Sequence, residues 1–408
     1  MRRVVVTGMA QTSPLGNSRV QAFERLLNLK NCVKYMPELE VFTRLNTKLA
    51  APAGDFVIPA HYTRKDLRTM GRVAIMSVVT AEEALKDAGL FGDEIITNGQ
   101  TGVSYGSSSG SLESIIDFYS MMDKKEVRTV TSGSYVKMMP QTSAVNISLY
   151  FKTTGRLIPS STACTSGAMG IGYGYEAIKN GYADIMIAGG ADELHPTQIA
   201  IFDTLYATSQ KNGTPELTPS PFDKNRDGLV VGEGAGTVIL EEYEHAKKRG
   251  AKIYAEVLGF GTSTDGTHIT SPNRDKMKSA LELALKDAGI SPDVIGYVNA
   301  HGTATIQGDT AESNATYDVF KRAVPVSSIK SYTGHTLGAC GAIEAILTID
   351  MAKKKWFCPT LNLSEVDEEC GKLDYITGSG REIDTDIVMT NNFAFGGINT
   401  SLIFKVMP

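Results

Sequence analysis

The chain has 408 residues, of which 42% are hydrophobic, and a formal net charge of −5. This length exceeds what one simple core usually holds, so two domains or a duplicated one are expected. The sequence contains no basic stripe of the kind that nucleic-acid binding requires. No apolar run approaches the length of a membrane span, so membrane insertion is not expected.

The five cysteines stand at positions 32, 164, 340, 358 and 370. Their odd number, their scatter and the lack of a CxxC pair argue against both a zinc site and a disulfide framework. The first eight residues are typical of a strand rather than of a leader peptide. These features predict a soluble protein of a reducing, cytoplasmic compartment.

In chain order, the first predicted elements are a short apolar strand at 4–8 and a helix. The helix begins after Asn17 or Ser18, either of which is a plausible N-cap. Apolar residues at helical spacing then predict one long helical region from 63 to 90.

The next strand, at 102–106, runs into a flexible polar turn of serines at 107–109. Further on, an apolar run at 156–159 leads through small polar residues to Cys164 and a glycine-rich helix pattern. This pattern predicts a strand, a sharp turn and a helix that begins at the cysteine. Backbone N–H groups at a helix start stabilise a thiolate and lower the pKa of the thiol. The stretch alone leaves open an inert cysteine at a close-packed turn.

The two halves of the chain repeat the same order of elements. Residues 84–90, Ala-Leu-Lys-Asp-Ala-Gly-Leu, match 284–290, and a strand follows each of them. The other matches are 4–8 with 255–261, the Cys164 turn with 327–344, and 185–190 with 387–397. We therefore predict a tandem duplication, with halves at 1–250 and 251–408. The continuous apolar strands suggest mostly parallel sheets covered on both faces.

Duplication brings equivalent strand ends from both halves to one pseudo-symmetric cleft. Cys164 comes from the first half, and His301 and His335 come from the second. A lone histidine is more often structural, but two in equivalent positions facing a helix-start cysteine favour a catalytic set. Lys330 lies five residues before His335, and Glu344 is its natural partner. A purely structural buried ion pair is the alternative for these two residues.

The tail contains a glycine-rich turn at 391–401 between two apolar strands. Its backbone N–H groups can complete an oxyanion hole together with the amide of Cys164. A plain β-turn is the alternative at this position.

These motifs resemble those of the elongating β-ketoacyl-acyl-carrier-protein synthases of type I/II, closest to type II, in the thiolase superfamily. The motifs that carry the resemblance are Thr162–Gly167, Asn299–Thr305, Lys330–His335, Asn392–Asn399, Pro221–Gly228 and Gly232–Gly236. The resemblance covers essentially the whole chain. It implies an α/β thiolase fold, a duplicated five-layer αβαβα sandwich. The Cys-His-His set separates this type from Cys-His-Asn initiating synthases and Cys-His-Cys thiolases.

The resemblance implies that Cys164 carries the growing acyl group as a thioester. His301 and His335 would promote decarboxylation of a malonyl unit, and Lys330 and Glu344 would support the His335 side. The amides of Cys164 and Phe393 would hold the oxyanion, and Phe393 would gate the acyl pocket. The positions implied to bind substrate are Thr303, Thr305, Ser108 and Phe395.

The partner implied by the resemblance is an acyl carrier protein, whose phosphopantetheine carries the substrates, so that no metal or organic cofactor is needed. Lys65 and Arg68 match basic residues implicated in carrier docking, but Tyr206 stands where arginine is expected. A homodimer is expected, and a heterodimer with a ketosynthase-like partner is the alternative.

Three features depart from the family pattern. Ala394 stands where glycine is common between the two phenylalanines of the gate, and Ile306 replaces a usual proline. Serines at 107–109 replace an isoleucine that usually lines the acyl channel. These departures fit a specialised synthase, for instance one resembling those of aryl-polyene pathways.

Three other functions compete with this interpretation. A non-catalytic chain-length factor would lack the nucleophile, which is present here. A degradative thiolase would need a second catalytic cysteine near the C-terminus, but Cys358 and Cys370 lie outside the glycine-rich turns. A Cys-His hydrolase is disfavoured only by the family resemblance.

Overall fold

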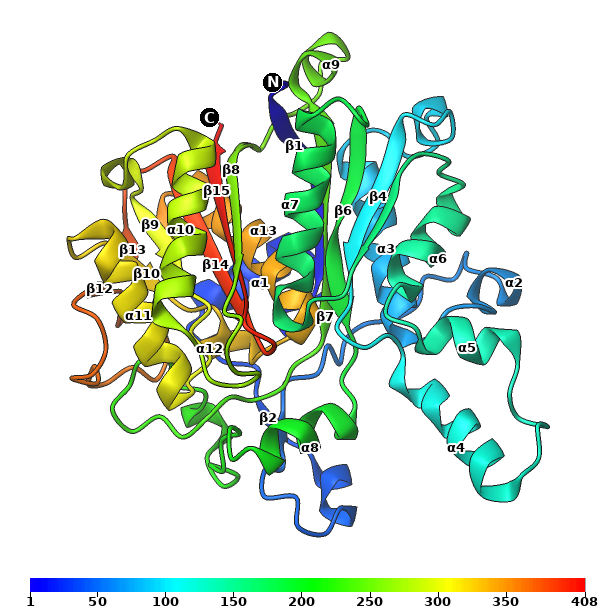
Figure 1. Ribbon diagram of the computed structural model, residues 1–408, viewed down its shortest axis with the longest axis horizontal. Helices are drawn as coiled ribbons and strands as arrows, with labels where there is room; N and C mark the ends of the chain where they lie inside the picture. Colours follow the sequence, from blue (N-terminus) through cyan, green and yellow to red (C-terminus); the bar gives the residue numbers. More distant parts are fainter. Residues whose placement is uncertain (408) are drawn as a thin grey trace.

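The computed structural model describes residues 1–407, and its centre is an 11-stranded sheet (Figure 1). The strand order is β12-β10-β9-β14-β15-β8-β1-β7-β6-β4-β5. The first half contributes β1 (Val4–Thr12), β4 (Thr101–Gly106), β5 (Leu157–Ser160), β6 (Ile185–Asp192) and β7 (Gly234–Glu242). The second contributes β8 (Ala255–Thr264), β9 (Tyr297–Asn299), β10 (Pro325–Ser327), β12 (Asp374–Tyr375), β14 (Ile387–Ala394) and β15 (Ile398–Val406). Two small ladders pair β2 (Lys34–Tyr35) with β3 (Leu49–Ala50), and β11 (Trp356–Phe357) with β13 (Arg381–Glu382).

The helices fall into the same two halves. The first half holds α1 (Arg19–Leu27), α2 (Arg64–Leu67), α3 (Arg72–Asp87), α4 (Ile115–Lys124), α5 (Ser132–Met138), α6 (Thr142–Phe151), α7 (Ser166–Lys179), α8 (Pro196–Thr204) and α9 (Tyr243–Lys248). The second holds α10 (Arg274–Ala288), α11 (Ile306–Phe320), α12 (Lys330–Thr333) and α13 (Cys340–Lys354). Among residues 1–407, no helix combines the length and apolar character that a membrane span needs.

The sheet repeats its own topology around the junction of β1 and β8. Outward from the junction, the order β1-β7-β6-β4-β5 mirrors β8-β15-β14-β9-β10, with the same sequence of antiparallel and parallel pairs. The two halves meet there at only two residue pairs, Val5 with Glu256 and Val6 with Ala255. The predicted duplicated thiolase fold is confirmed. The predicted boundary at 250 falls between α9 and β8, and its placement stays a prediction.

The buried helices α7 and α13 form the middle layer between the two halves of the sheet (Figure 1). Helices α3 and α6 cover the outer face of the first half, and α10 and α11 cover that of the second. The two central helices approach closely because small residues face each other. A Cβ added at Gly167 would lie 2.8 Å from the carbonyl oxygen of Gly338. This contact places the N-terminal ends of α7 and α13 side by side.

The prediction of mostly parallel strands is wrong. Five strand pairs of the sheet are parallel and five are antiparallel. The antiparallel pairs lie in the centre, where helices cover both faces and where β1 and β7 are almost wholly buried. A continuous apolar strand therefore indicates that both faces of the sheet are covered, but it does not indicate the direction of the strand.

Two local predictions were also refined. Ser18 caps α1 as predicted, by accepting the N–H of Gln21. The single helical region predicted at 63–90 is divided into α2 and α3, because the chain leaves the helical conformation before Gly71, the N-cap of α3. The serine turn after β4 is anchored rather than flexible, since the buried hydroxyl of Ser107 donates to Asp192 at 2.7 Å.

Candidate active site

Cys164 lies in the turn between β5 and α7, which is the short 3-10 helix η4 (Ala163–Thr165). Ala163 has φ +49°, in the left-handed region that few side chains adopt. The hydroxyl of Ser166 holds this turn, since it accepts the Thr162 N–H at 2.9 Å and donates to the Ala163 carbonyl at 2.7 Å. The cysteine is thereby fixed at the helix start, with 5% of its surface exposed.

The second half repeats this turn after β10. Leu337 has φ +52° and opens the 3-10 helix η7 (Leu337–Ala339), which leads into α13. The N–H of Gly338 donates to Asp192 at 2.6 Å. Because Asp192 ends β6 and also binds the Ser107 hydroxyl, this carboxylate joins the two halves beside the cysteine turn.

His335 presents a hydrogen-bond donor to the site. Its Nδ1 accepts the backbone N–H of Leu337 at 3.2 Å, so the proton of the neutral ring resides on Nε2. Its backbone N–H is fixed on the carbonyl of Val230 at 2.7 Å. Nε2 itself is buried and has no partner within residues 1–407. This orphan N–H is therefore available to an oxygen atom of a substrate.

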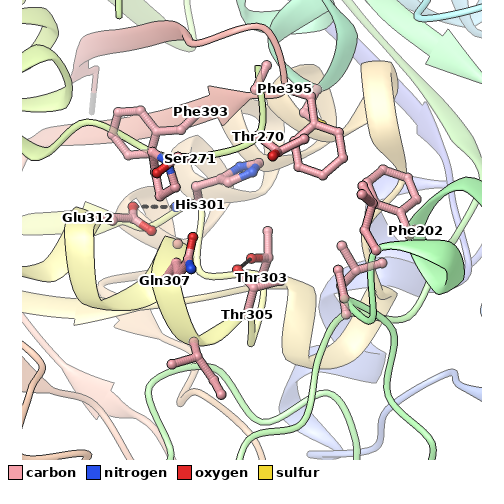
Figure 2. Close-up of a pocket in the computed structure, with 18 of the residues that line it drawn as sticks. Phe202, Thr270, Ser271, His301, Thr303, Thr305, Gln307, Glu312, Phe393 and Phe395 are labelled. Carbon is pink, nitrogen blue, oxygen red and sulfur yellow. Dashed lines mark hydrogen bonds between the residues drawn. The ribbon is translucent and has the colours of Figure 1, made fainter. Parts of the chain in front are cut away.

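His301 follows β9 and faces His335, with ring centroids 5.1 Å apart and planes at 87°. The Asn392 amide nitrogen lies 3.4 Å from Nδ1 of His301 and favours the same tautomer. The His301 backbone N–H donates to Glu312 at 2.7 Å (Figure 2). The protein thus contacts Nδ1 of both imidazoles, which leaves Nε2 of each ring for a substrate.

The sulfur of Cys164 and one ring nitrogen of each histidine lie within 4.8 Å of one another. A metal ion fits such a distance, but a ligating histidine must offer a lone pair at the metal. The His335 tautomer offers an N–H instead. The chemistry of this set favours a substrate oxygen over a metal ion.

Lys330 and Glu344 form the predicted ion pair, at 2.5 Å, and both are nearly inaccessible to solvent. Burial opposes the charge of Lys330, but the Glu344 carboxylate helps to keep the pKa of this lysine above its usual value. Glu344 also accepts a hydrogen bond from the Asn392 amide at 2.8 Å. The pair is therefore connected to His301 through Asn392, and not only to the His335 side.

The electrostatics of the site correct one expectation. Burial raises the pKa of Cys164 to about 12, although Lys330 and nearby backbone N–H groups act in the opposite direction. The resting cysteine is therefore a thiol, and the predicted lowering of its pKa by the helix start is wrong. Burial, assisted by Lys330, lowers the pKa of His301 and of His335 well below the ordinary value. Both histidines are neutral donors at physiological pH.

For the second oxyanion donor, we propose Phe395 in place of the predicted Phe393. Burial raises the pKa of the Cys164 thiol, and the backbone N–H groups of Phe395 and of Cys164 itself act in the opposite direction. Phe393 lies two residues earlier, within the β14–β15 ladder, and its buried ring stands 6.1 Å from that of His301. The turn between β14 and β15 begins only after Ala394, so it contains Phe395 and not Phe393. Ala394 is not among the residues with positive φ, so it fits this gate without backbone strain.

A cavity of about 420 Å³ leads to Cys164 between α8, α11 and the β14–β15 turn (Figure 2). Thr303 and Thr305 line it, as predicted for substrate-binding positions, and their hydroxyls bond each other at 2.9 Å. Phe395 also lines it and packs against Phe202 at 5.1 Å. Ser108 does not line it, because its main-chain N–H is turned to Asp192 at 3.1 Å.

Lys65 and Arg68 are exposed at α2 but do not line the cavity. In Figure 1, α2 and α11 lie at opposite sides of the molecule. Their role in carrier docking stays a prediction.

Three buried residues of the site were missed at the level of sequence. Asn392 connects the ion pair to His301, Glu312 accepts the N–H groups of His301 and Gly302, and Asp192 joins the repeats. Burial raises the pKa of Glu312 to about 8. Asn392 and Asp192 stand at the carboxyl ends of the equivalent strands β14 and β6, and that signal was available from the repeat.

We expect Lys330→Met to lower the free energy of unfolding by about 3–5 kcal/mol, because it leaves the Glu344 carboxylate buried without a partner. Decarboxylation of a malonyl thioester should fall as well, since Glu344, which accepts the Asn392 amide, loses the lysine that fixes its position. The double variant Lys330→Met/Glu344→Met should recover most of the stability but not the decarboxylation. Chemical denaturation and carbon dioxide release measure the two effects.

The matched control is the exposed pair Lys355–Asp384, at 2.7 Å, where Lys355→Met should leave the unfolding midpoint in place. Full decarboxylation in the destabilised Lys330→Met protein would show that the buried pair is purely structural.

Two family models match most of the chain. "Beta-ketoacyl synthase, N-terminal domain" matches residues 1–246, and "Beta-ketoacyl synthase, C-terminal domain" matches residues 254–364. A curated relative, 3-oxoacyl-[acyl-carrier-protein] synthase 2 of Vibrio cholerae, is 40% identical over 414 residues, which cover 100% of this chain and 99% of the relative.

Solved structures agree with these matches. A β-ketoacyl synthase from Burkholderia phymatum is 54% identical and superposes with a TM-score of 0.98, over 100% of both chains. A ketosynthase from Xenorhabdus doucetiae, solved in complex with its chain length factor, is 27% identical with a TM-score of 0.83, over 100% of this chain and 98% of that one.

Proposed function

The chain belongs to the β-ketoacyl synthase family, and on that basis we propose that Cys164, His301 and His335 are the catalytic set of its reaction. Like its curated relatives, the chain is a 3-oxoacyl-acyl-carrier-protein synthase. It is an acyltransferase that condenses malonyl-acyl carrier protein with an acyl group in chain elongation. The observation that carries the proposed set is the convergence of the three side chains within 4.8 Å at the end of one cavity.

In the first step, the Cys164 sulfur attacks the carbonyl of the acyl-pantetheine thioester. The oxyanion forms between the N–H groups of Cys164 and Phe395. The carbon–sulfur bond to pantetheine then breaks, and the departing thiol takes the proton that Cys164 gives up. This net transfer explains how a resting thiol with a raised pKa can serve as nucleophile.

In the second step, the malonyl thioester enters the same cavity and places its carbonyl oxygen at the Nε2–H groups of His301 and His335. Carbon dioxide leaves, and the electron pair of the broken bond forms an enolate whose oxygen these donors stabilise. The enolate carbon attacks the acyl-Cys164 carbonyl, the sulfur leaves and regains a proton, and the 3-oxoacyl chain remains on the carrier. Protein donors and the carrier's pantetheine suffice for each step, so we propose that no metal or organic cofactor takes part.

The competing functions fit the site less well. The nucleophile and both histidines are present and converge, which a non-catalytic chain-length factor would not require. Cys358 and Cys370 are buried outside the cavity lining, so neither supplies the second cysteine of a thiolase.

The substrate partner is an acyl carrier protein, and we propose a homodimer as the working form. The strand β5 lies at one edge of the sheet with its ladder open. Helix α4 of the same half exposes apolar side chains, namely those of Ile115, Ile116, Tyr119 and Met122. An open sheet edge and an exposed apolar helix face are each typical of a surface that a second chain covers. A heterodimer with a ketosynthase-like partner is the alternative, and the cytoplasmic location stays a prediction.

For the acyl donor, we propose an unsaturated, stiff chain of the aryl-polyene kind. The carrier arm fills the cavity that Thr303 and Thr305 line, so the acyl chain passes Cys164 on its far side. Ser108 is close to that side, because its N–H shares the Asp192 carboxylate with Gly338. A serine there leaves more room than an isoleucine, and a rigid polyenoyl chain needs such room because it cannot coil.

We expect Ser108→Ile to lower turnover of a conjugated dienoyl-carrier protein more than that of a saturated medium-chain donor, by roughly 1–3 kcal/mol of discrimination. The measurement is competition between the two donors, with malonyl-carrier protein and mass detection of the 3-oxoacyl products. Ser108→Ala separates bulk from polarity and should keep the wild-type preference. If the wild type preferred the saturated donor and Ser108→Ile did not alter that preference, the chain would be assigned to ordinary fatty-acid elongation instead.

A further inference from the structure

We propose that Arg226 is a positioning residue, which joins two segments of the cavity lining and thereby fixes the threonine hydroxyls that meet the pantetheine arm. This inference rests on the proposed function, because that function supplies the arm. Arg226 lies in the loop between α8 and β7, and only 1% of its side chain is exposed. The residue does not itself line the cavity, so it acts through its neighbours.

The guanidinium group of Arg226 has five N–H donors, and each of them has an acceptor. The acceptors, at 2.5 to 3.4 Å, are the carbonyls of Thr305, Ile306 and Asp223, the Thr310 hydroxyl and the Asp367 carboxylate. They come from the loop of Arg226 itself, from the start of α11 and from the loop between β11 and β12. A lysine carries three donors on a single nitrogen, so it cannot reproduce these contacts.

Two of the connected segments contribute to the cavity lining. Asp227, Gly228 and Leu229 directly follow Arg226 and form one part of it. Thr305 and Ile306, whose carbonyls Arg226 holds, form another part. A Cβ added at Gly228 would lie 2.5 Å from the Ala207 carbonyl oxygen, so the first segment is also closely packed against the chain after α8. Arg226 thus fixes the second segment to one that cannot easily shift.

The loop before α11 is held by opposite charges on its two kinds of backbone group. Asp309 accepts the N–H groups of Thr303 at 3.0 Å and of Ala304 at 3.2 Å. Arg226 binds the carbonyls that follow them, and its Nε lies 3.6 Å from the Asp309 carboxylate. Ala304 has φ +68°, a conformation that persists only where the surrounding contacts impose it.

This arrangement directs the Thr305 hydroxyl toward Thr303. Thr305 is the N-cap of α11, but its hydroxyl makes no capping bond to the helix. It bonds the Thr303 hydroxyl at 2.9 Å instead, and both residues line the cavity (Figure 2). A pantetheine arm carries amide groups that such hydroxyls can bind. Because the pair is already ordered, binding of the arm costs less conformational entropy.

The reacting groups depend on other contacts. Ser166 holds the turn of Cys164, and Glu312 accepts the backbone N–H of His301. Loss of the Arg226 contacts should therefore weaken binding of the arm, while the chemical steps proceed as before. A merely structural arginine would instead change the number of folded enzyme molecules and leave KM in place.

The test is steady-state condensation by the full chain, with malonyl-pantetheine and with malonyl-carrier protein at a saturating acyl donor. Active sites are counted by the amount of acyl-Cys164 formed. For Arg226→Lys, KM should rise roughly tenfold for both malonyl substrates, because both carry the arm, and kcat per active site should stay within about twofold. Thr310→Val removes one acceptor without leaving a buried charge unpaired, and it should raise KM about threefold.

The matched control is Arg274→Lys. The Arg274 guanidinium pairs with Asp318 at 2.6 Å near the other end of α11, outside the cavity lining, so KM should stay unchanged. If the wild type condenses neither malonyl substrate, the proposed function itself fails. If the wild type is active but Arg226→Lys leaves KM unaltered, or lowers kcat per active site, Arg226 does not position the site for the arm. If Arg226→Lys does not fold, Thr310→Val decides alone, and an unaltered KM in that variant overturns the proposal.

Discussion

Replacing Cys164 by glutamine is expected to abolish condensation while malonyl decarboxylation continues. Condensation needs the sulfur as acyl carrier, and the other four cysteines are outside the cavity lining. Decarboxylation needs only the malonyl thioester and the donors of His301 and His335. The glutamine carboxamide is about the size of an acylated cysteine, and its oxygen can occupy the N–H groups of Cys164 and Phe395. Carbon dioxide release and product formation, measured in parallel, report the two activities.

Two further cysteine variants serve as controls for this result. Cys164→Ala should also lose acyl transfer, and Cys370→Ala should retain full condensation because it changes a cysteine that does not line the cavity. If iodoacetamide modified another cysteine first and activity disappeared with that modification, Cys164 would not be the nucleophile.

The variants His301→Ala and His335→Ala should lose malonyl decarboxylation by about 10²–10³-fold each, the usual cost of removing one oxyanion donor. At least one of them should still form acyl-Cys164, because acyl transfer uses the backbone N–H groups instead. Single-turnover decarboxylation and intact-mass detection of the acyl-enzyme separate the two steps. His61→Ala, half-exposed and outside the cavity lining, is the control that should keep both.

The pH dependence offers a second test of the histidines. Burial lowers the pKa of both rings well below the ordinary value, so they stay neutral where an exposed histidine titrates. Wild-type decarboxylation should therefore change little between pH 7 and pH 6, a window below the pKa of about 8 of Glu312, which accepts the His301 backbone N–H. A steep loss over that window, or normal decarboxylation in both alanine variants, would contradict the two-donor mechanism.

The repeat in the sequence predicted much of this site, because equivalent strand ends in a duplicated fold must converge. It placed Cys164, His301 and His335 together, and it paired Lys330 with Glu344. It did not specify where the turn after β14 begins. We propose Phe395 in place of Phe393 because β14 ends at Ala394, which the glycine-rich motif does not specify.

The sequence also did not reveal how deeply Cys164 is buried, where α2 lies, or in which direction the central strands run. The helix start at Cys164 was expected to lower the pKa of the thiol, but enclosure by α7, α13 and the gate outweighs that effect. Lys65 and Arg68 matched a docking pattern, yet only the folded chain shows that α2 and α11 lie at opposite sides of the molecule. Buried strands likewise hid the antiparallel centre of the sheet.

The most direct test of the account is peptide-level mass analysis of the protein during a single reaction cycle. After incubation with an acyl-carrier protein, the acyl mass should appear on the peptide that contains Cys164 and on no other. Addition of malonyl-carrier protein should remove it, with one 3-oxoacyl-carrier product formed for each acyl group lost. An acyl group on another cysteine, or its loss as free acid without a 3-oxoacyl product, would contradict the proposed mechanism.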